Sequence, residues 1–410
     1  MSSHRLNGGN VITHNKVRVL RRAMNDERMT ELVDSVAHSR VADALALTAQ
    51  LLHNGVNAWD ILEPLQSISC FAFSHQWASI HVPKEHEYLG RLLRQVPESQ
   101  HSDFLSRFVE YLAWSPKYVA NYVASFPSDV ERSLNNRSCY LRAMDERMAL
   151  HALFYARELV EMGGLDAALQ TALQVGCNDI SQELGHYFSC TDSLVRLAQR
   201  SGLPEANNYL VAMTLFLMQS SPIVLLQYGT TIRSMDDVLP HLVKKGGFAG
   251  YHAMIVANAL IKNRAFLGEK YYLHALKGLE IVAGRLSDTL SVEELDALVR
   301  NESVPKSNNL LKDLETAIWR CKKPQALAIL RHFLHDHGAA LELTATIAHS
   351  FTAINDHPHD PHYVTFPLSA FELIPHLNEG DLELILAHCV EFAIERVQMY
   401  GIMTGSPYLS

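Results

Sequence analysis

The stretch RVADALALTAQLLHNG, residues 40–55, decides the fold class. Its apolar residues recur at intervals of three and four, which places them on one face of an α-helix. Gly55 follows the last of them, and glycine often ends a helix because it adopts a left-handed conformation without strain. The spacing therefore predicts an amphipathic helix that begins near residue 40 and ends at Gly55.

The same periodicity recurs along most of the chain. It predicts further helices at 146–164, 206–219, 251–261, 271–286, 323–338 and 380–401. Alternating strand patterns joined by Asn-Gly or Asp-Gly turns are absent from the sequence. The fold class expected from these patterns is all-α, built as stacked helical hairpins.

One polar segment, 290–311, separates two groups of predicted helices. Ser291 to Glu294 has the form of a capping box, so a short helix is expected inside this segment. Two helical lobes that enclose a histidine-lined cavity are one arrangement consistent with this division. The expected segments are an N-terminal tail with the first helix start (1–22), a main helical lobe (23–289), the connection (290–311), a C-terminal helical lobe (312–402) and a tail (403–410).

The composition describes a soluble globular chain that can bury a large core. Of its 410 residues 48% are hydrophobic and 19% are charged, and the formal net charge is -9. Nucleic acid favours a basic protein surface, so this mild acidity argues against a nucleic-acid partner. The short basic cluster KVRVLRR, residues 16–22, is interpreted as a solvated helix start.

The sequence also bears on location. No stretch has the roughly 18 to 20 uninterrupted apolar residues that cross a bilayer, and the N-terminus lacks the apolar core of a signal peptide. The six cysteines are scattered, without a C-x-x-C pair, which favours reduced thiols. A cytoplasmic protein that does not bind membranes is therefore expected, with its oligomeric state left open.

The outlier in the composition is histidine, with 22 residues. His186, His252 and His362 share a pattern in which a small residue beside an apolar one follows seven or eight positions later, and His38 shows a fainter version. Seven residues make two helical turns, so the histidine and the small residue lie on one helix face. If the copies are equivalent, two or three of these histidines converge on one interior cavity.

Two constellations favour a metal. Glu183 and His186 form an E-x-x-H pair, which on a helix places carboxylate and imidazole on one face. The stretch HPHDPHYVTFPLSAFELIPHL, residues 357–377, brings His359 and Asp360 near His362. A mononuclear site that uses Glu183, His186, His359 and Asp360 follows from these patterns.

The same stretch has a second interpretation, as a polar surface loop that enters a helix near Thr365 or Pro367. Asp360 is then placed to accept a hydrogen bond from an imidazole N–H and to select its tautomer.

Several enzyme motifs are missing. The sequence contains no G-x-S-x-G, no P-loop, no G-x-G-x-x-G and no H-E-x-x-H. Rieske-type C-x-H and C-x-x-H pairs are also missing. Serine hydrolases, P-loop nucleotide enzymes and iron–sulfur enzymes are therefore disfavoured.

Three segments resemble the questin oxidase family. HYVTFPLSAFELIPHL resembles the family's H-x-V-T-x-P-x-x-A motif with its L-P-x-L end, at His362, Val364, Thr365, Pro367, Ala370, Pro375 and Leu377. LHALKGLEIV resembles the H-A-I-K-x-x-E-A helix, at His274, Ala275, Lys277 and Glu280. GHYFSCTDSLVRLA resembles the family's histidine helix, which ends in a run like Arg196-Leu197-Ala198.

The resemblance implies an all-helical oxygenase that opens the ring of an aromatic polyketide by Baeyer–Villiger-type chemistry. It makes His362, His252, His186 and His274 the acid, base or ligand residues, with Thr365 as a hydrogen-bond donor to the substrate. Histidine suits such work because its pKa lies near neutral pH.

The expected function is thus an oxidoreductase for a small apolar or aromatic molecule, with either no cofactor or a single iron-type metal. Two alternatives stay open from the sequence. One is a non-catalytic helical module that binds a partner or an apolar ligand, and the other is a mononuclear non-haem metal enzyme that uses histidines with Glu183 or Asp360.

Overall fold

The computed structural model describes residues 27–72, 80–117, 135–219, 234–338, 340–355 and 360–403. Within these ranges the protein is helical, without a β-strand, and the extended backbone forms two isolated bridges, Ala72 with Lys117 and Ile354 with Ile402. The all-α prediction is confirmed.

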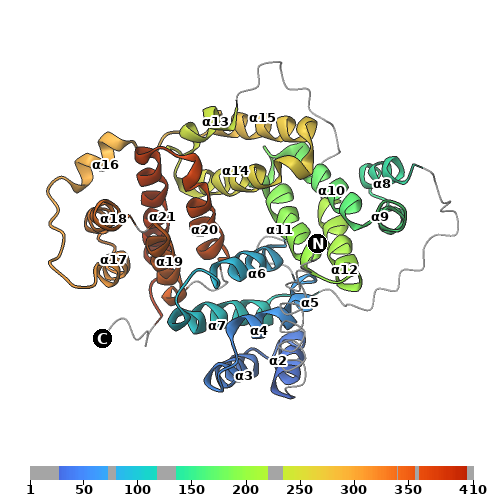
Figure 1. Ribbon diagram of the computed structural model, residues 1–410, viewed down its shortest axis with the longest axis horizontal. Helices are drawn as coiled ribbons and strands as arrows, with labels where there is room; N and C mark the ends of the chain where they lie inside the picture. Colours follow the sequence, from blue (N-terminus) through green and yellow to red (C-terminus); the bar gives the residue numbers. More distant parts are fainter. Residues whose placement is uncertain are drawn as a thin grey trace, which may run out of the picture.

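The N-terminal helices form the layer at the bottom of Figure 1, drawn in blue. The helices α2 and α3 pack on each other and on α7, and α6 follows the short turns around α4. Their bounds are α2 Glu27–Ala37, α3 Val41–His53, α4 Ala58–Leu62, η1 Glu63–Leu65, α5 Gln66–Ser69, α6 His81–Leu92 and α7 Glu98–Trp114.

The middle of the chain consists of helices that pack against their neighbours in sequence, as expected of stacked hairpins. The pairs are α8 with α9, α9 with α10, α11 with α12, and α14 with α15. The bounds are α8 Asn136–Asp145, α9 Ala149–Gly163, α10 Leu165–Gly176, η2 Cys177–Asp179, η3 Glu183–Gly185, α11 His186–Arg200, α12 Leu203–Leu217, α13 Met235–Leu242, α14 Gly247–Leu267 and α15 Glu269–Arg285.

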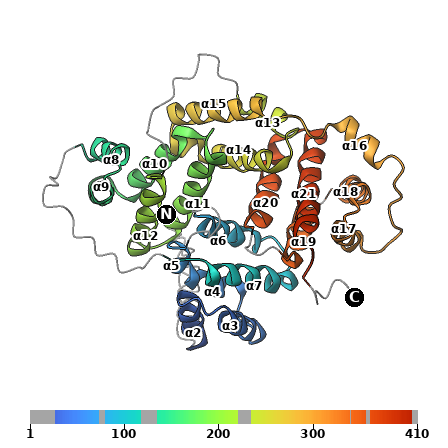
Figure 2. The ribbon, with the colours of Figure 1, turned by 180° about the vertical axis from the view of Figure 1, so that it is seen from behind.

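The C-terminal helices gather at one edge of the molecule, where α17 and α18 pack against α21 (Figures 1 and 2). The bounds are α16 Val292–Val299, α17 Leu310–Trp319, α18 Lys323–His337, α19 Ala340–Ser350, η4 Phe351–Ala353, α20 His362–Leu373, η5 Ile374–His376 and α21 Glu379–Tyr400.

The helix ends follow the predicted signals. Gly338 caps α18 in the left-handed conformation, with φ 61°, and Gly55 has φ 77° just beyond α3. Ser291 and Glu294 form a reciprocal capping box at the start of α16, which confirms the short helix expected there. The broader division into two lobes at 290–311 stays a prediction, and residues 1–22 and most of the tail 403–410 lie outside the described residues.

One helix start differs from the prediction. α20 begins at His362, before both Thr365 and Pro367. The Asp360 carboxylate accepts a hydrogen bond from the backbone N–H of His362 at 2.9 Å, so the turn before the helix provides a partner for one of its unpaired amides. Pro367 then lies inside the helix, where its ring removes one backbone hydrogen bond.

Four helices lie at the centre of the molecule in both views: α6, α11, α14 and α20. In α6 every residue except Arg91 is buried, and α11, α14 and α20 are also buried along most of their length. A helix that is buried on all faces belongs in the interior of a large core. We call these four helices the central bundle. None of the described helices is long and apolar enough to cross a membrane.

Candidate metal centre

The helices α6 and α20 of the central bundle lie side by side and run in the same direction. Three of the contacting pairs that join them are each separated by 281 positions: His81 with His362, Tyr88 with Ser369, and Arg91 with Glu372. A constant separation means that both helices advance together, because antiparallel neighbours give a separation that changes along the helix.

The other neighbours in the central bundle run in the same direction as well. Between α6 and α11, His81 contacts His186 and Lys84 contacts Ser189. Between α11 and α14, His186 contacts His252 and Asp192 contacts Asn263. Between α14 and α20, His252 contacts His362 and Asn258 contacts Glu372. In each interface, the residue nearer the start of one helix contacts the residue nearer the start of the other. The starts of three helices and the first turns of α14 therefore meet at one end of the bundle.

Four buried histidines meet at that end. His81, His186 and His362 are the first residues of α6, α11 and α20, and His252 lies in the second turn of α14. The Nε2 atom of His186 lies 3.0 Å from that of His81 and 3.0 Å from that of His252, and the Nε2 atoms of His252 and His362 are 2.9 Å apart. We call these four side chains the imidazole cluster.

Two of the four imidazoles have a defined tautomer. His252 donates from Nδ1 to the Phe248 carbonyl at 2.7 Å, and His362 donates from Nδ1 to the Asp360 carboxylate at 2.5 Å. A neutral imidazole that donates from Nδ1 carries a lone pair on Nε2. Two lone pairs therefore face each other across 2.9 Å, an arrangement that is repulsive unless a proton or a metal ion lies at the cluster.

A proton is the less favourable of these two occupants. Burial, followed by the positive charge of neighbouring groups, lowers the pKa of His81, His186 and His252 well below its ordinary value. The positive ends of three helices also meet here, and they oppose protonation further. His81, His186 and His252 are accordingly neutral, which is the form of imidazole that binds metals.

The distances suit a metal ion. Two adjacent nitrogen ligands at about 2.1 Å from a metal lie about 3.0 Å apart where the angle between them is about 90°, and about 3.4 Å apart in a tetrahedral site. The Nε2 separations of 2.9 to 3.0 Å are nearer the first value. The ligand atoms of His81, His186 and His362 all lie within 4.8 Å of one another, as a group able to hold an ion. An all-imidazole set is suited to zinc, copper, iron or nickel.

Asp360 orients the cluster from outside. Burial opposes its ionisation, but the charge of His362, the hydrogen bonds from that residue and the charge of Arg396 hold the pKa of Asp360 well below its usual range. Arg396 pairs with Asp360 at 3.0 Å and lies over the Phe392 ring at 4.8 Å. A carboxylate on the far nitrogen of an imidazole is the usual way to hold a ligand's tautomer and raise its basicity.

The structure therefore brings together three of the predicted histidines, His186, His252 and His362. Asp360 contacts His362, as its predicted role in selecting a tautomer requires. His81 is not among the predicted site residues, because the sequence favours an ordinary, partly buried interface histidine over one that lines a cavity. It begins a helix just as His186 and His362 do, but the small residue in its helix, Gly90, comes nine positions later and breaks the spacing rule.

Other predicted residues lie elsewhere. His274 is on α15, where its Nε2 donates to the Asn178 carbonyl at 3.1 Å, outside the chain of Nε2 contacts. Thr365 lies one turn into α20 and is buried. His359 falls outside the described residues.

The structure does not place Glu183 beside the imidazole cluster, as the E-x-x-H prediction expects. Glu183 is exposed while His186 is buried. The reason is local: Leu184 has φ 55° and Gly185 has φ 74°, so the helical spacing of three residues does not hold between the two side chains.

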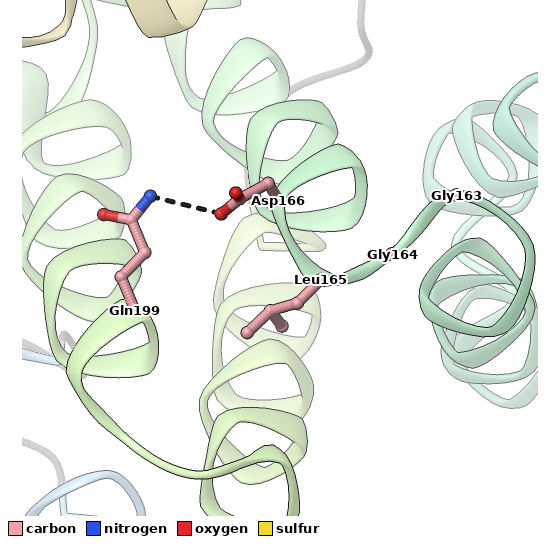
Figure 3. Close-up of a pocket in the computed structure, with 5 residues that line it drawn as sticks. All are labelled: Gly163, Gly164, Leu165, Asp166 and Gln199. Atoms are coloured by element: carbon pink, nitrogen blue, oxygen red, sulfur yellow. Dashed lines mark hydrogen bonds between the residues drawn. The ribbon is translucent and has the colours of Figure 1, made fainter. Parts of the chain in front are cut away.

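The expected cavity also takes a different form. Because the Nε2 atoms are in contact, the space between the imidazoles suits one ion, and the ring of an aromatic substrate has to lie outside the imidazole cluster. A separate surface pocket of about 530 Å³ is lined by Gly163, Gly164, Leu165, Asp166 and Gln199 (Figure 3). Gln199 lies thirteen residues after His186 on α11, which is about 20 Å along the helix axis, so this pocket is remote from the imidazole cluster.

Comparison with known proteins gives no assignment, since no protein-family model, curated protein or solved structure matches the chain. The resemblance to the questin oxidase family remains a prediction.

Proposed function

We propose that this protein is a mononuclear metal-dependent oxidoreductase whose metal is held by His81, His186, His252 and His362. The observation that carries the proposal is a chain of three Nε2 contacts of 2.9 to 3.0 Å that joins four buried imidazoles, together with the ligand atoms of His81, His186 and His362, which lie within 4.8 Å of one another. The Nδ1 atoms of His252 and His362 are engaged outside this chain, so their Nε2 atoms face it. Neutral nitrogens at this spacing are costly to bury together without a cation.

The reaction class rests on a different argument. A redox metal of the iron type supplies electron transfer and activation of oxygen when it is bound, and the resemblance to questin oxidases favours that choice over a hydrolytic metal. The substrate class, a small apolar or aromatic molecule, comes from the same resemblance. The non-catalytic alternative receives less support, because a binding scaffold has no need of four buried histidines with their nitrogens in contact.

The residues of the chain have separate tasks in this proposal. The four imidazoles bind and orient the ion, and Asp360 holds His362 in the tautomer that leaves Nε2 free to ligate. Burial of all four side chains excludes bulk water from the ion, which strengthens electrostatic interactions with whatever approaches it.

Metal content tests the proposal directly. Protein purified without a histidine tag should contain about one equivalent of a first-row transition metal by elemental analysis, and His252→Ala should contain less than about a tenth of an equivalent. His101→Gln is the matched control, because His101 is buried on α7 and hydrogen-bonds only to the Val96 carbonyl at 3.1 Å. A wild-type protein that stays metal-free after exposure to iron, zinc and cobalt contradicts the proposal.

Turnover tests the reaction class. The loaded protein should consume oxygen in the presence of small phenolic compounds, and both His252→Ala and His362→Ala should abolish that consumption. Oxygen consumption that survives both substitutions excludes the imidazole cluster as the site of reaction, even if the metal is bound.

A further inference from the structure

A second layer of polar side chains lies one helical turn after the imidazole cluster, toward the C-terminal ends of α6, α11 and α20. Lys84, Ser189 and Thr365 follow His81, His186 and His362 by three positions each, so they project from the same helix faces. Lys84 is fully buried, with 0% exposure, and its Nζ donates a hydrogen bond to the Ser189 hydroxyl at 3.0 Å.

The Lys84 ammonium has no carboxylate as an ion-pair partner among the residues that the structure describes. Burial lowers the pKa of Lys84, and the neighbouring Cys190 and Asp192 oppose this shift. Asp192 already pairs with Arg196 at 2.9 Å and accepts a hydrogen bond from Asn263 at 2.6 Å. The adjacent Glu85 accepts a hydrogen bond from Tyr363 at 2.8 Å, and burial raises the pKa of Glu85 to about 8. Near neutral pH, Glu85 is therefore largely uncharged.

Among the residues that the structure describes, the site has an excess of positive charge. Within these residues Asp360 is the carboxylate that hydrogen-bonds to the imidazole cluster, and its charge is offset by Arg396. The starts of α6, α11 and α20 add the positive ends of three helix dipoles, and a bound divalent ion adds two further charges. A buried cation without a counter-charge is unfavourable, so the complete site requires an anion.

Thr365 provides a second indication of a ligand. Its side chain is 1% exposed, and its Oγ1 has no hydrogen-bond partner within the described ranges. Buried hydroxyls without a partner are uncommon in proteins, and they often mark a place where a ligand or water is bound. Thr365 shares its helix face with His362 and belongs to the same layer as Lys84.

We propose that the site binds a monoanionic oxygen ligand between the metal ion and the Lys84 ammonium, with the Thr365 hydroxyl as a second donor. This inference rests on the proposed metal centre. The ligand oxygen has two sources with the same chemistry, an ionised phenol of the substrate or a small free carboxylate. Lys84 is then a specificity-determining residue that selects an ionised ligand over a neutral one.

Anion titration of the cobalt-loaded full-length protein tests the proposal. Cobalt(II) reports ligand binding through its visible spectrum, and the two probes are 4-nitrophenolate and formate. Lys84→Met should weaken binding of the tighter probe at least tenfold, whereas its affinity for cobalt should stay the same or increase, because a neighbouring positive charge is removed. A purely structural role for Lys84 predicts that both affinities fall together.

Lys262→Met is the matched control. Lys262 lies at the other end of the central bundle and pairs with Glu372, so its removal should change anion affinity less than twofold. Thr365→Val keeps the shape of the side chain and should weaken anion binding about threefold or more. If Lys84→Met does not fold, Thr365→Val alone tests the anion site. Tighter binding of 4-nitrophenolate than of formate identifies the substrate phenol as the ligand, and the reverse order identifies a free carboxylate.

The outcomes that overturn the inference are distinct from failure of the metal centre. A wild-type protein that binds cobalt but neither probe at 100 mM excludes the anion site and leaves the proposed function intact. Equal anion affinity in wild type, Lys84→Met and Thr365→Val also excludes the anion site and leaves the proposed function intact. A wild-type protein that binds no metal removes the proposed function and this inference together.

Discussion

The pH dependence of stability should reveal a buried ion triad that joins α7, α17 and α19. His349 donates from Nδ1 to Glu315 at 2.7 Å and from Nε2 to Asp103 at 3.0 Å, so both of its nitrogens carry protons. Burial opposes the charge, but the hydrogen bonds and negative charges of Asp103 and Glu315 raise the pKa of His349 to about 9.

The size of the effect follows from this pKa. The difference between a pKa of about 9 and the ordinary histidine pKa of 6.5 corresponds to about 3.4 kcal/mol at 1.36 kcal/mol per pH unit. The Asp103 side chain is 39% exposed, so solvent screens part of the interaction, and about 2 kcal/mol is the expected contribution. Because the pKa is raised by folding, this stabilisation is complete below pH 6.5 and is lost as the pH rises through about 9.

Urea unfolding of wild type and His349→Gln measures the effect. At pH 6 the free energy of unfolding of wild type should exceed that of the variant by about 2 kcal/mol, and near pH 10 the difference should fall below about 0.5 kcal/mol. Other groups titrate in both proteins, so their contributions cancel in the difference. A difference that is the same at pH 6 and pH 10 refutes the assignment of a charged His349.

Three further substitutions test the site and its support. Asp360→Asn should weaken metal affinity about 10- to 100-fold, measured by competition with a chelator, because the amide accepts the same hydrogen bond without the charge; a change below twofold contradicts this role. Wild type should lose stability between pH 4.5 and about 8, because a carboxyl whose pKa is raised by folding loses its stabilising contribution as the pH rises through that range. Glu85→Gln should make this loss smaller by about 2 to 4 kcal/mol, measured by urea unfolding. Parallel pH profiles of the two proteins exclude a raised pKa of Glu85. Gly185→Ala should lower the free energy of unfolding by about 1 to 3 kcal/mol, because Gly185 has φ 74° and an added Cβ would press on the Val256 side chain. It should also weaken metal binding, because Gly185 directly precedes His186. An unchanged thermal midpoint contradicts this prediction.

The helices of this protein are predictable from local sequence. Apolar spacing and terminal residues such as Gly55 and Gly338 act within a few positions, and that is the range over which one sequence carries direct information. The same holds for the capping box at Ser291. The sequence predicts the start of α20 too late, because Pro367 resembles a first-turn residue. The helix begins five positions before Pro367, at His362, where the Asp360 carboxylate accepts a hydrogen bond from the backbone N–H.

The site was predictable only in part, for a physical reason. A spacing of seven residues within one helix can be read from the sequence, and it selected His186, His252 and His362. Whether their helices meet depends on contacts between residues 66 and 110 positions apart, which local patterns do not contain. His81 escaped because Tyr88 occupies the position where the other helices carry a small residue. The side chain of Tyr88 is accommodated by a hydrogen bond to Ser369 at 3.1 Å.

The common direction of the central helices has a consequence during synthesis on the ribosome. Neighbours that run the same way cannot be joined by a short turn, so long excursions separate them, and the contacts between the four histidines span 105, 66 and 110 positions. Such distant contacts form slowly. His362 and Asp360 emerge last, after the other three helices of the bundle have been made. The imidazole cluster is therefore complete only when α20 joins the other three helices of the central bundle, and the proposed metal centre would form at that point.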